Sequence, residues 1–240
     1  LLRLLATLAR LEPRQVIVMA PDIGRYAPLV AAVFGTVPAE QRIPWSIADA
    51  RPAAAGPLAA AIDLLLRLPR SRLAAGEVLA LLQVPAVRRR FGVDEQGLER
   101  LRTWIRESGV RWGESGAMRA ELGLPADPAN TWEFGLERLF LGYAMPAAAS
   151  RQLYGQVLPY ADVEGREVEY LGALQELVDA LGRWRADLRT ARSPAAWRAD
   201  LDHLLDSFFA AAGEEELALL ELVRGSLEQL AQRAGAAGFA

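Results

Sequence analysis

Few residues in this sequence are of the types that carry out chemistry. The 240 residues include one histidine, His203, and no cysteine, and all 27 basic residues are arginines. Without cysteine the chain cannot form disulfides, thiolate nucleophiles or thiolate metal sites. Without lysine it cannot contain a phosphate-binding loop of the GxxxxGK[ST] type or a Schiff-base amine. A metal site would depend almost wholly on carboxylates, and a Ser-His-Asp triad would have to include His203.

The spacing around His203 predicts that its side chain faces solvent. Trp197, Leu201, Leu204 and Phe208 recur at helical intervals, and a step of 100° per residue puts His203 on the opposite face. A general base also needs an orienting partner within hydrogen-bond reach. We therefore expect no catalytic role for His203. A small hydrolase ranks last among the possible functions, because no nucleophile elbow or metal cluster is present.

Arg88, Arg89 and Arg90 form the densest basic run. Such a run could clamp a phosphate, since guanidinium groups bind phosphate in a bidentate manner. It could instead supply cations to the last turn of a helix that ends before Gly92, where they complement the helix dipole. We favour the second interpretation.

The stretch RESGVRWGESG, residues 106–116, contains a second group of candidates. A helix is expected to end at Ser108-Gly109, and Arg111 and Trp112 then lie between glycines. An exposed indole could stack on a base or on a partner protein, whereas a buried one would anchor the loop. We favour the anchor for Trp112, with Arg111 facing a partner or DNA. Five other tryptophans fall in regular elements and are expected in the core: Trp45, Trp104, Trp132, Trp184 and Trp197.

Composition is that of a globular protein. Hydrophobic residues make up 52% of the chain, but no uncharged apolar run approaches the roughly 18 to 20 residues that span a bilayer. Residues 1–14 are expected to form an amphipathic helix instead of a signal peptide. The formal net charge of −3 does not suit a protein that coats nucleic acid. Any DNA contact should therefore be local or shared with a larger assembly.

Residues 1–50 have the pattern of an α/β unit. QVIVMAPD (15–22) is a continuous apolar run rich in β-branched residues, which predicts a strand buried on both faces. Asp22 should cap a helix that runs to Phe34, and IPWSI (43–47) predicts a second strand. Because two strands cannot bury both of their faces alone, we expect further strands from elsewhere to complete the sheet.

Residues 51–240 are predicted to be helical throughout. Asp94 and Ser193 should cap two of the helices, and Asn130 with Glu133 has the spacing of a capping box. Three apolar stripes at helical spacing mark the expected buried faces. They comprise Leu58, Ile62, Leu65 and Leu66; Trp132, Leu136, Leu139, Phe140 and Tyr143; and Val168, Leu171, Leu174, Leu177, Val178, Leu181 and Trp184. Further helices are expected at 78–82, from Asp94 to Gly109, from Pro194, and from Glu214 to about residue 234.

Several stretches together resemble the RecC family, the gamma chain of exodeoxyribonuclease V. They are VIVMAPDIGRYAPLVAAVFG, IPWSIAD, VLALLQVPAVRRRFGVDEQGLERLRTWIRESGVRWG, TWEFGLERLFLGYAM and VLPYADVEG, spread over residues 16–165. The resemblance implies a middle fragment of a longer chain. It implies a mainly α fold with a small α/β part. Residues 1–50 would be the start of a superfamily-I helicase-like 2A domain, and residues 51–240 a helical 2B insertion.

The resemblance also implies a function. The gamma chain is a helicase-like body without ATPase activity, which agrees with the lack of an arginine at 20–22, where working helicases carry one. The family's 3′ DNA strand runs through a channel scanned for the Chi sequence, but the Chi-reading residues lie mainly in other domains. The implied role is a non-catalytic, cytoplasmic DNA-channel and scaffold module for recombination and double-strand break repair. It needs no cofactor and works with the alpha and beta chains and with DNA.

Six residues are the candidates for DNA or partner binding in such a module: Arg88, Arg89, Arg90, Arg106, Arg111 and Trp112. No catalytic or metal-binding residue is expected. The alternative is a free-standing helical adaptor that recognises a protein partner and never contacts DNA.

Overall fold

The computed structural model describes residues 15–20, 26, 29–30, 32–34, 43, 56–145 and 152–236. The chain divides into two compact units, Leu1–Gly56 and Pro57–Ala240. We call the second one the helical unit. Whether the two units correspond to helicase 2A and 2B domains stays a prediction.

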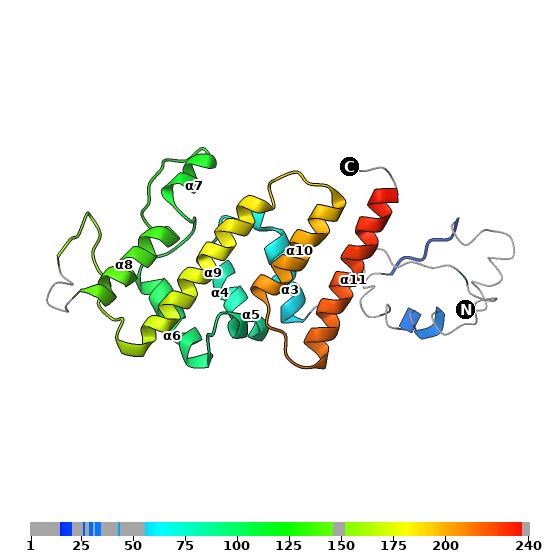
Figure 1. Cartoon of the computed structure of the whole chain (residues 1–240), viewed down its shortest axis with the longest axis horizontal. Coiled ribbons are helices and arrows are strands. Elements are labelled where there is room, and N and C mark those ends of the chain that lie inside the picture. The colour runs from blue at the N-terminus through cyan, green and yellow to red at the C-terminus, as the bar shows by residue number, and fades with distance from the viewer. Residues whose placement is uncertain are drawn as a thin grey trace. The chain divides into compact units, whose positions relative to one another are not determined.

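Helices form nearly all of the regular structure in the described residues, so the expectation of a mainly α protein is confirmed (Figure 1). Short 3-10 helices are labelled η. The elements are α3 (Pro57–Leu66), η3 (Leu68–Arg70), α4 (Ala75–Leu82), α5 (Pro85–Arg90), α6 (Glu95–Glu107), α7 (Gly116–Glu121), α8 (Trp132–Ala144), η5 (Gly165–Glu167), α9 (Val168–Asp187), α10 (Pro194–Phe208) and α11 (Glu214–Ala236). None of these helices is both long and apolar enough to span a membrane.

The first predicted strand is not formed. Residues 16–20 have no regular structure, and Ile17 and Met19 are 85% and 90% exposed. A strand needs a hydrogen-bonding neighbour, and the β pairing found in the described residues is confined to an isolated bridge between Tyr154 and Val157. The described part of the next segment is helical up to Phe34, as predicted. Asp22 and the second predicted strand, except for Ile43, lie outside the described residues.

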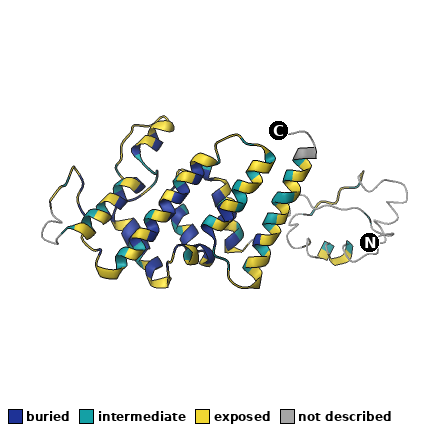
Figure 2. Ribbon diagram, in the orientation of Figure 1, coloured by how far each residue is buried: buried dark blue, intermediate teal, exposed yellow. Residues whose placement is uncertain are grey.

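α9 is the central helix of the helical unit. Its leucines recur every three to four residues, so one face is continuously apolar, and Leu171, Leu177 and Leu181 are almost completely buried. The helix contacts α6, α8 and η3. Figure 2 shows the buried residues along the faces that these helices turn toward one another.

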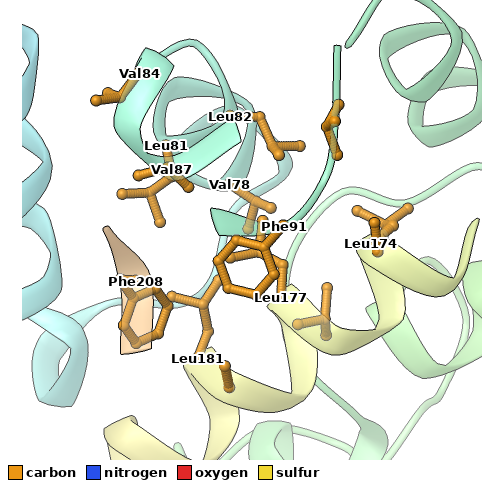
Figure 3. Packing of buried hydrophobic residues seen from close by; sticks show 14 of the residues in the cluster. Val78, Leu81, Leu82, Val84, Val87, Phe91, Leu174, Leu177, Leu181 and Phe208 are labelled. Atoms are coloured by element: carbon orange, nitrogen blue, oxygen red, sulfur yellow. The ribbon is translucent and has the colours of Figure 1, made fainter. Parts of the chain in front are cut away.

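A second part of the core joins α4, α5, α9 and α10. Figure 3 shows Val87 and Phe91 pointing toward Leu181 and Phe208. The rings of Phe91 and Phe208 lie 6.0 Å apart in a tilted arrangement, which suits the aromatic quadrupoles. This cluster connects the N-terminal and C-terminal helices of the unit.

Local capping signals set several helix boundaries. Asp94 accepts a hydrogen bond of 2.7 Å from the Gly97 amide, and Ser193 accepts one from the Ala196 amide, so both predicted caps are confirmed. The predicted cap at Asn130 is wrong. Thr131 caps α8 and accepts from the Phe134 amide.

The predicted apolar stripes extend too far in two places. Leu66, the last residue of α3, is 48% exposed, whereas Leu58, Ile62 and Leu65 are buried. Phe140 and Tyr143 are 37% and 46% exposed on α8. Trp132 and Leu139 of the same helix are buried against the core, so only the first half of that stripe behaves as predicted.

Candidate functional site

The Trp112 loop, defined here as residues 109–115, joins α6 to α7. It begins at Gly109, whose φ of +88° ends α6 in the left-handed conformation that glycine adopts most easily. Two backbone hydrogen bonds of 2.8 Å connect the loop to residues 72–75: Gly113 donates to the Arg72 carbonyl, and Ala75 donates to the Arg111 carbonyl. The segments that carry Arg72 and Arg111 are therefore held side by side.

The other edge of the Trp112 loop is bonded to the start of α8. The Arg111 amide donates to the Asn130 carbonyl at 2.9 Å, and the Trp132 amide donates to the Gly113 carbonyl at 2.9 Å. The Asn130 side chain donates to the Gly109 carbonyl at 2.7 Å. Because both edges of the loop are bonded, its backbone has little freedom to move.

Arg119 of α7 holds the Trp112 loop in place through side-chain hydrogen bonds. It is 8% exposed, and its guanidinium donates to the carbonyls of Trp112, Asp127 and Ala129 at 3.1, 2.9 and 2.7 Å. It forms no ion pair with any acid in the described residues. A buried charge needs compensation, and three carbonyl dipoles supply it at the two terminal nitrogens, while the Nε atom has no hydrogen-bond partner among the described residues. Arg119 therefore connects the Trp112 loop to residues 127–129 by binding carbonyls of both segments.

Trp112 is half-buried and lies against two arginines. The Cζ atom of Arg119 is 4.4 Å from the centre of the indole, and that of Arg72 is 5.7 Å from it. Both distances are within the range of cation–π attraction. The contact with Arg119 favours the predicted anchor role of Trp112 over stacking on a base.

The arginine patch consists of Arg70, Arg72 and Arg111. All three residues are exposed, and none forms an ion pair within the described residues. Within the described residues, the Arg111 guanidinium donates only to the carbonyl of its neighbour Val110, at 3.0 Å. The carboxylate of Glu77, close to Arg72 in sequence, instead accepts from Ser71 and Ala74 at the start of α4. The positive charge of the patch is therefore available to an external anion.

Glu114 lies on the inner side of the same loop. Its carboxylate lies against Gly182 of α9, and burial raises the pKa of this carboxyl above its ordinary value, although nearby Arg185 acts in the opposite direction. Glu114 thus faces the core and does not act as a counter-ion for the arginine patch.

The arginine run, Arg88 to Arg90, lies in the last turn of α5, as predicted, and its charges are paired. Arg88 pairs with Glu95, and Arg89 pairs with Glu216 while donating to the Ala210 carbonyl at 2.9 Å. Arg90 lies 3.7 Å from Glu176. These arginines connect α5 to α9 and α11, and the structure does not bring them together with Arg111 and Trp112.

Arg106, the remaining candidate, lies near the end of α6. It pairs with Glu107 at 3.1 Å and is 72% exposed. Glu107 also accepts a hydrogen bond from the Tyr160 hydroxyl, and that bond, followed by the one from Arg106, lowers the pKa of Glu107.

His203 is exposed, as predicted. Its ring lies 5.7 Å from that of Trp184, beside a groove of about 240 Å³ that Asp187 and Ser207 help to line. The Ser207 hydroxyl donates to the His203 carbonyl, and Asp187 lies 3.6 Å from Arg192. Among the described residues, the geometry thus provides neither an activated serine nor an orienting carboxylate for the imidazole. Within the described residues no three metal-binding side chains gather.

Arg72 and Arg119 are the site residues that the sequence analysis missed. Arg72 lies in a connector without periodicity, and Arg119 resembles a polar surface residue of a short helix. Only the tertiary contacts with Trp112 distinguish them from other arginines, so no sequence signal could have identified them.

Comparison with known proteins gives a consistent result. The family profile for the "RecBCD enzyme subunit RecC fourth domain" matches residues 55–240. The RecBCD enzyme subunit RecC of Escherichia coli is 42% identical over 220 residues, which cover 90% of this chain and 19% of the relative. The proteins of the same name from Mycobacterium tuberculosis and Haemophilus influenzae are 37% and 32% identical, and the matches cover 82% and 92% of this chain.

The chain spans about a fifth of the length of these relatives. The match includes the whole helical unit, with its Trp112 loop, arginine patch and arginine run. The chain therefore belongs to the RecC family, and its residues 55–240 are a RecC fourth domain.

Proposed function

We propose that this chain is a non-catalytic DNA-channel and scaffold module of the gamma subunit of exodeoxyribonuclease V. In this role it acts in double-strand break repair and homologous recombination, in the cytoplasm and without a cofactor of its own. Its partners are the alpha and beta chains and DNA. Residues 1–50 contribute to a helicase-like 2A domain, and residues 51–240 are the 2B insertion.

One observation carries the proposal. A RecC-family helical unit holds a loop rigid on two sides and presents unpaired guanidinium groups beside it. A scaffold needs rigid connections, which the bonded loop and the buried Arg119 provide. A DNA channel needs local positive charge, which a chain with a net charge of −3 must concentrate in particular places.

The paired arginine run and the geometry around His203 support a non-catalytic role. Arg88 and Arg89 are used in contacts between elements, as expected of a structural module. The solitary imidazole has neither the nucleophile nor the orienting acid that general-base catalysis requires.

Hydrogen exchange on the assembled complex tests the proposal. The amides of the complete RecC chain should be measured alone, with the alpha and beta chains, and then with forked DNA. We expect protection in the helical unit on assembly and further protection when DNA is added. The chain alone should neither hydrolyse ATP nor cleave DNA.

The alternative, a helical adaptor that never contacts DNA, predicts a different pattern. Protection would then appear on binding of a protein partner and would not change on addition of forked DNA. Protection in neither step would contradict both functions.

A further inference from the structure

We infer that Arg72 and Arg111, beside Trp112, bind the phosphodiester backbone of a DNA strand. This inference rests on the proposed function and names the residues and the ligand chemistry for it. The contact is with phosphate and not with a base, so it should not depend on DNA sequence.

The first support is the distribution of charge. Many arginines of the helical unit have acidic partners, as Arg67 has in Asp63 and Arg224 in Asp206, whereas exposed Arg166, Arg183 and Arg233 are scattered single residues without one in the described part of the chain. Arg72 and Arg111 have none within the described residues, and exposed Arg70 lies two positions before Arg72. The backbones that carry Arg72 and Arg111 are hydrogen-bonded to each other's segments, so these like charges belong to adjacent stretches of the surface. Like charges on adjacent segments repel one another unless salt screens them. An external anion would relieve that repulsion.

The second support is rigidity. The backbone bonds from Gly113 to Arg72 and from Ala75 to Arg111 fix the relative positions of the two arginine backbones. The indole restricts the Arg72 guanidinium further. Arginine ordered in this way loses less conformational freedom on binding a phosphate, and its planar fork matches the phosphate oxygens.

The surroundings favour a nucleic acid over the acidic face of a protein. Protein interfaces have apolar centres from which charge is depleted. The most exposed leucines of the helical unit are Leu153 and three residues of α11, Leu217, Leu222 and Leu230, which are outside the patch. Among the described residues, Trp112 is the aromatic side chain in contact with a patch arginine, and Arg119 already packs against its ring. The patch therefore offers charge without an apolar centre.

The test uses the complete RecC chain assembled with the alpha and beta chains. The double variant Arg72→Gln/Arg111→Gln is compared with wild type for binding to forked DNA between about 50 and 200 mM salt, a range over which phosphate contacts weaken strongly. The salt exponent is the magnitude of the slope of log affinity against log salt concentration. Because each lost phosphate contact lowers this exponent by roughly 0.7 to 0.9, it should fall by about 1.5. Affinity at the lowest salt should fall roughly tenfold, and equally for unrelated DNA sequences.

The matched control is Arg72→Lys/Arg111→Lys, which keeps both charges. It should retain most of the salt exponent of wild type, since that exponent counts neutralised phosphates. Both double variants should melt at the wild-type temperature, because the side chains are exposed. If the glutamine variant keeps the wild-type exponent, the phosphate contact does not exist.

Hydrogen exchange separates this inference from the proposed function. If DNA protects other parts of the helical unit but leaves residues 70–75 and 109–114 unchanged, the inference fails while the channel role stands. If assembly with the protein chains alone protects these residues, the patch binds an acidic protein surface and the inference is overturned. If DNA protects no part of the chain, the proposed function fails with it.

Discussion

The arginine run and the arginine patch differ in how their charge is used. The run has three consecutive arginines, and each lies beside a carboxylate from another element: Glu95, Glu216 or Glu176. The patch draws on residues 70, 72 and 111, and none of them has an acidic partner in the described residues. The denser group in the sequence is thus the one with less charge to offer a ligand.

The surrounding elements explain the difference. The last turn of α5 lies within ion-pair distance of both α9 and α11, and each of those helices contributes a glutamate. Arg72 and Arg111 of the patch lie on connectors, where the backbone is bonded to other loops and to the start of α8, and Arg70 is the last residue of the short η3. Because helices carry most of the acids, a cation on a connector is less easily neutralised. Free positive charge therefore follows from tertiary position and not from the density of arginines.

Replacing Arg119 with methionine should have the largest effect on the patch side of this comparison. The change removes three hydrogen bonds to carbonyls and the contact with Trp112, and buried carbonyls left unpaired are costly. We expect the free energy of unfolding to fall by about 3 kcal/mol, measured in urea. Arg233→Met, at the exposed end of α11, should change it by less than about 0.5 kcal/mol. Equal effects would show that Arg119 does not hold the loop.

Replacing Trp112 with alanine should have the next largest effect. The half-buried indole would leave Arg119 without its ring partner, and we expect a loss of about 2 kcal/mol. Thermal unfolding measures this loss, with Arg111→Ala as a neighbouring change that should be nearly neutral. An unchanged melting temperature for Trp112→Ala would refute the anchor.

The two groups of arginines should also differ in their contributions to stability. Arg89→Ala removes an ion pair and a carbonyl bond that connect α5 to the α10–α11 region, and should cost about 1 kcal/mol. Arg72→Ala should cost less than about 0.5 kcal/mol, because its contacts are at the surface. Urea unfolding of the two variants measures both losses. A larger loss of unfolding free energy for Arg72→Ala than for Arg89→Ala would contradict this prediction.

Glu114→Gln should have the smallest effect, and its sign should depend on pH. Burial raises the pKa of Glu114 in the folded chain above its ordinary value of 4.5. The folded state therefore binds this proton more tightly, and wild type loses stability as pH rises from that value through the raised pKa. The glutamine variant should be more stable than wild type at pH 7 and equal to it below about pH 4. Unfolding measured at both values tests this, and a variant less stable at pH 7 would contradict it.

The sequence predicted those features of the fold that depend on near neighbours. Asp94 and Ser193 cap their helices because each needs only an amide three residues ahead. The long stripe of α9 is buried as predicted, since its period is local. Asn130 and Thr131 are both good caps, and the choice between them depends on Asn130 bonding to Gly109 across the loop.

Features that depend on distant partners could not be predicted in the same way. Residues 16–20 have a strand-like composition, but a strand requires a neighbour that composition cannot supply. Arg111 and Trp112 were identified because glycines flank them, whereas Arg72 and Arg119 became visible only through their contacts with the indole. The pairing of Arg89 with Glu216 likewise joins segments that are far apart in the chain.

The most direct test of the account compares the salt exponents of DNA binding for two double variants of the complete RecC assembly. Arg72→Gln/Arg111→Gln removes unpaired charge, and Arg88→Gln/Arg90→Gln removes the same amount of paired charge. We expect an exponent lower by about 1.5 for the first variant and the wild-type exponent for the second. Equal exponents for the two variants, or a decrease only for Arg88→Gln/Arg90→Gln, would contradict it.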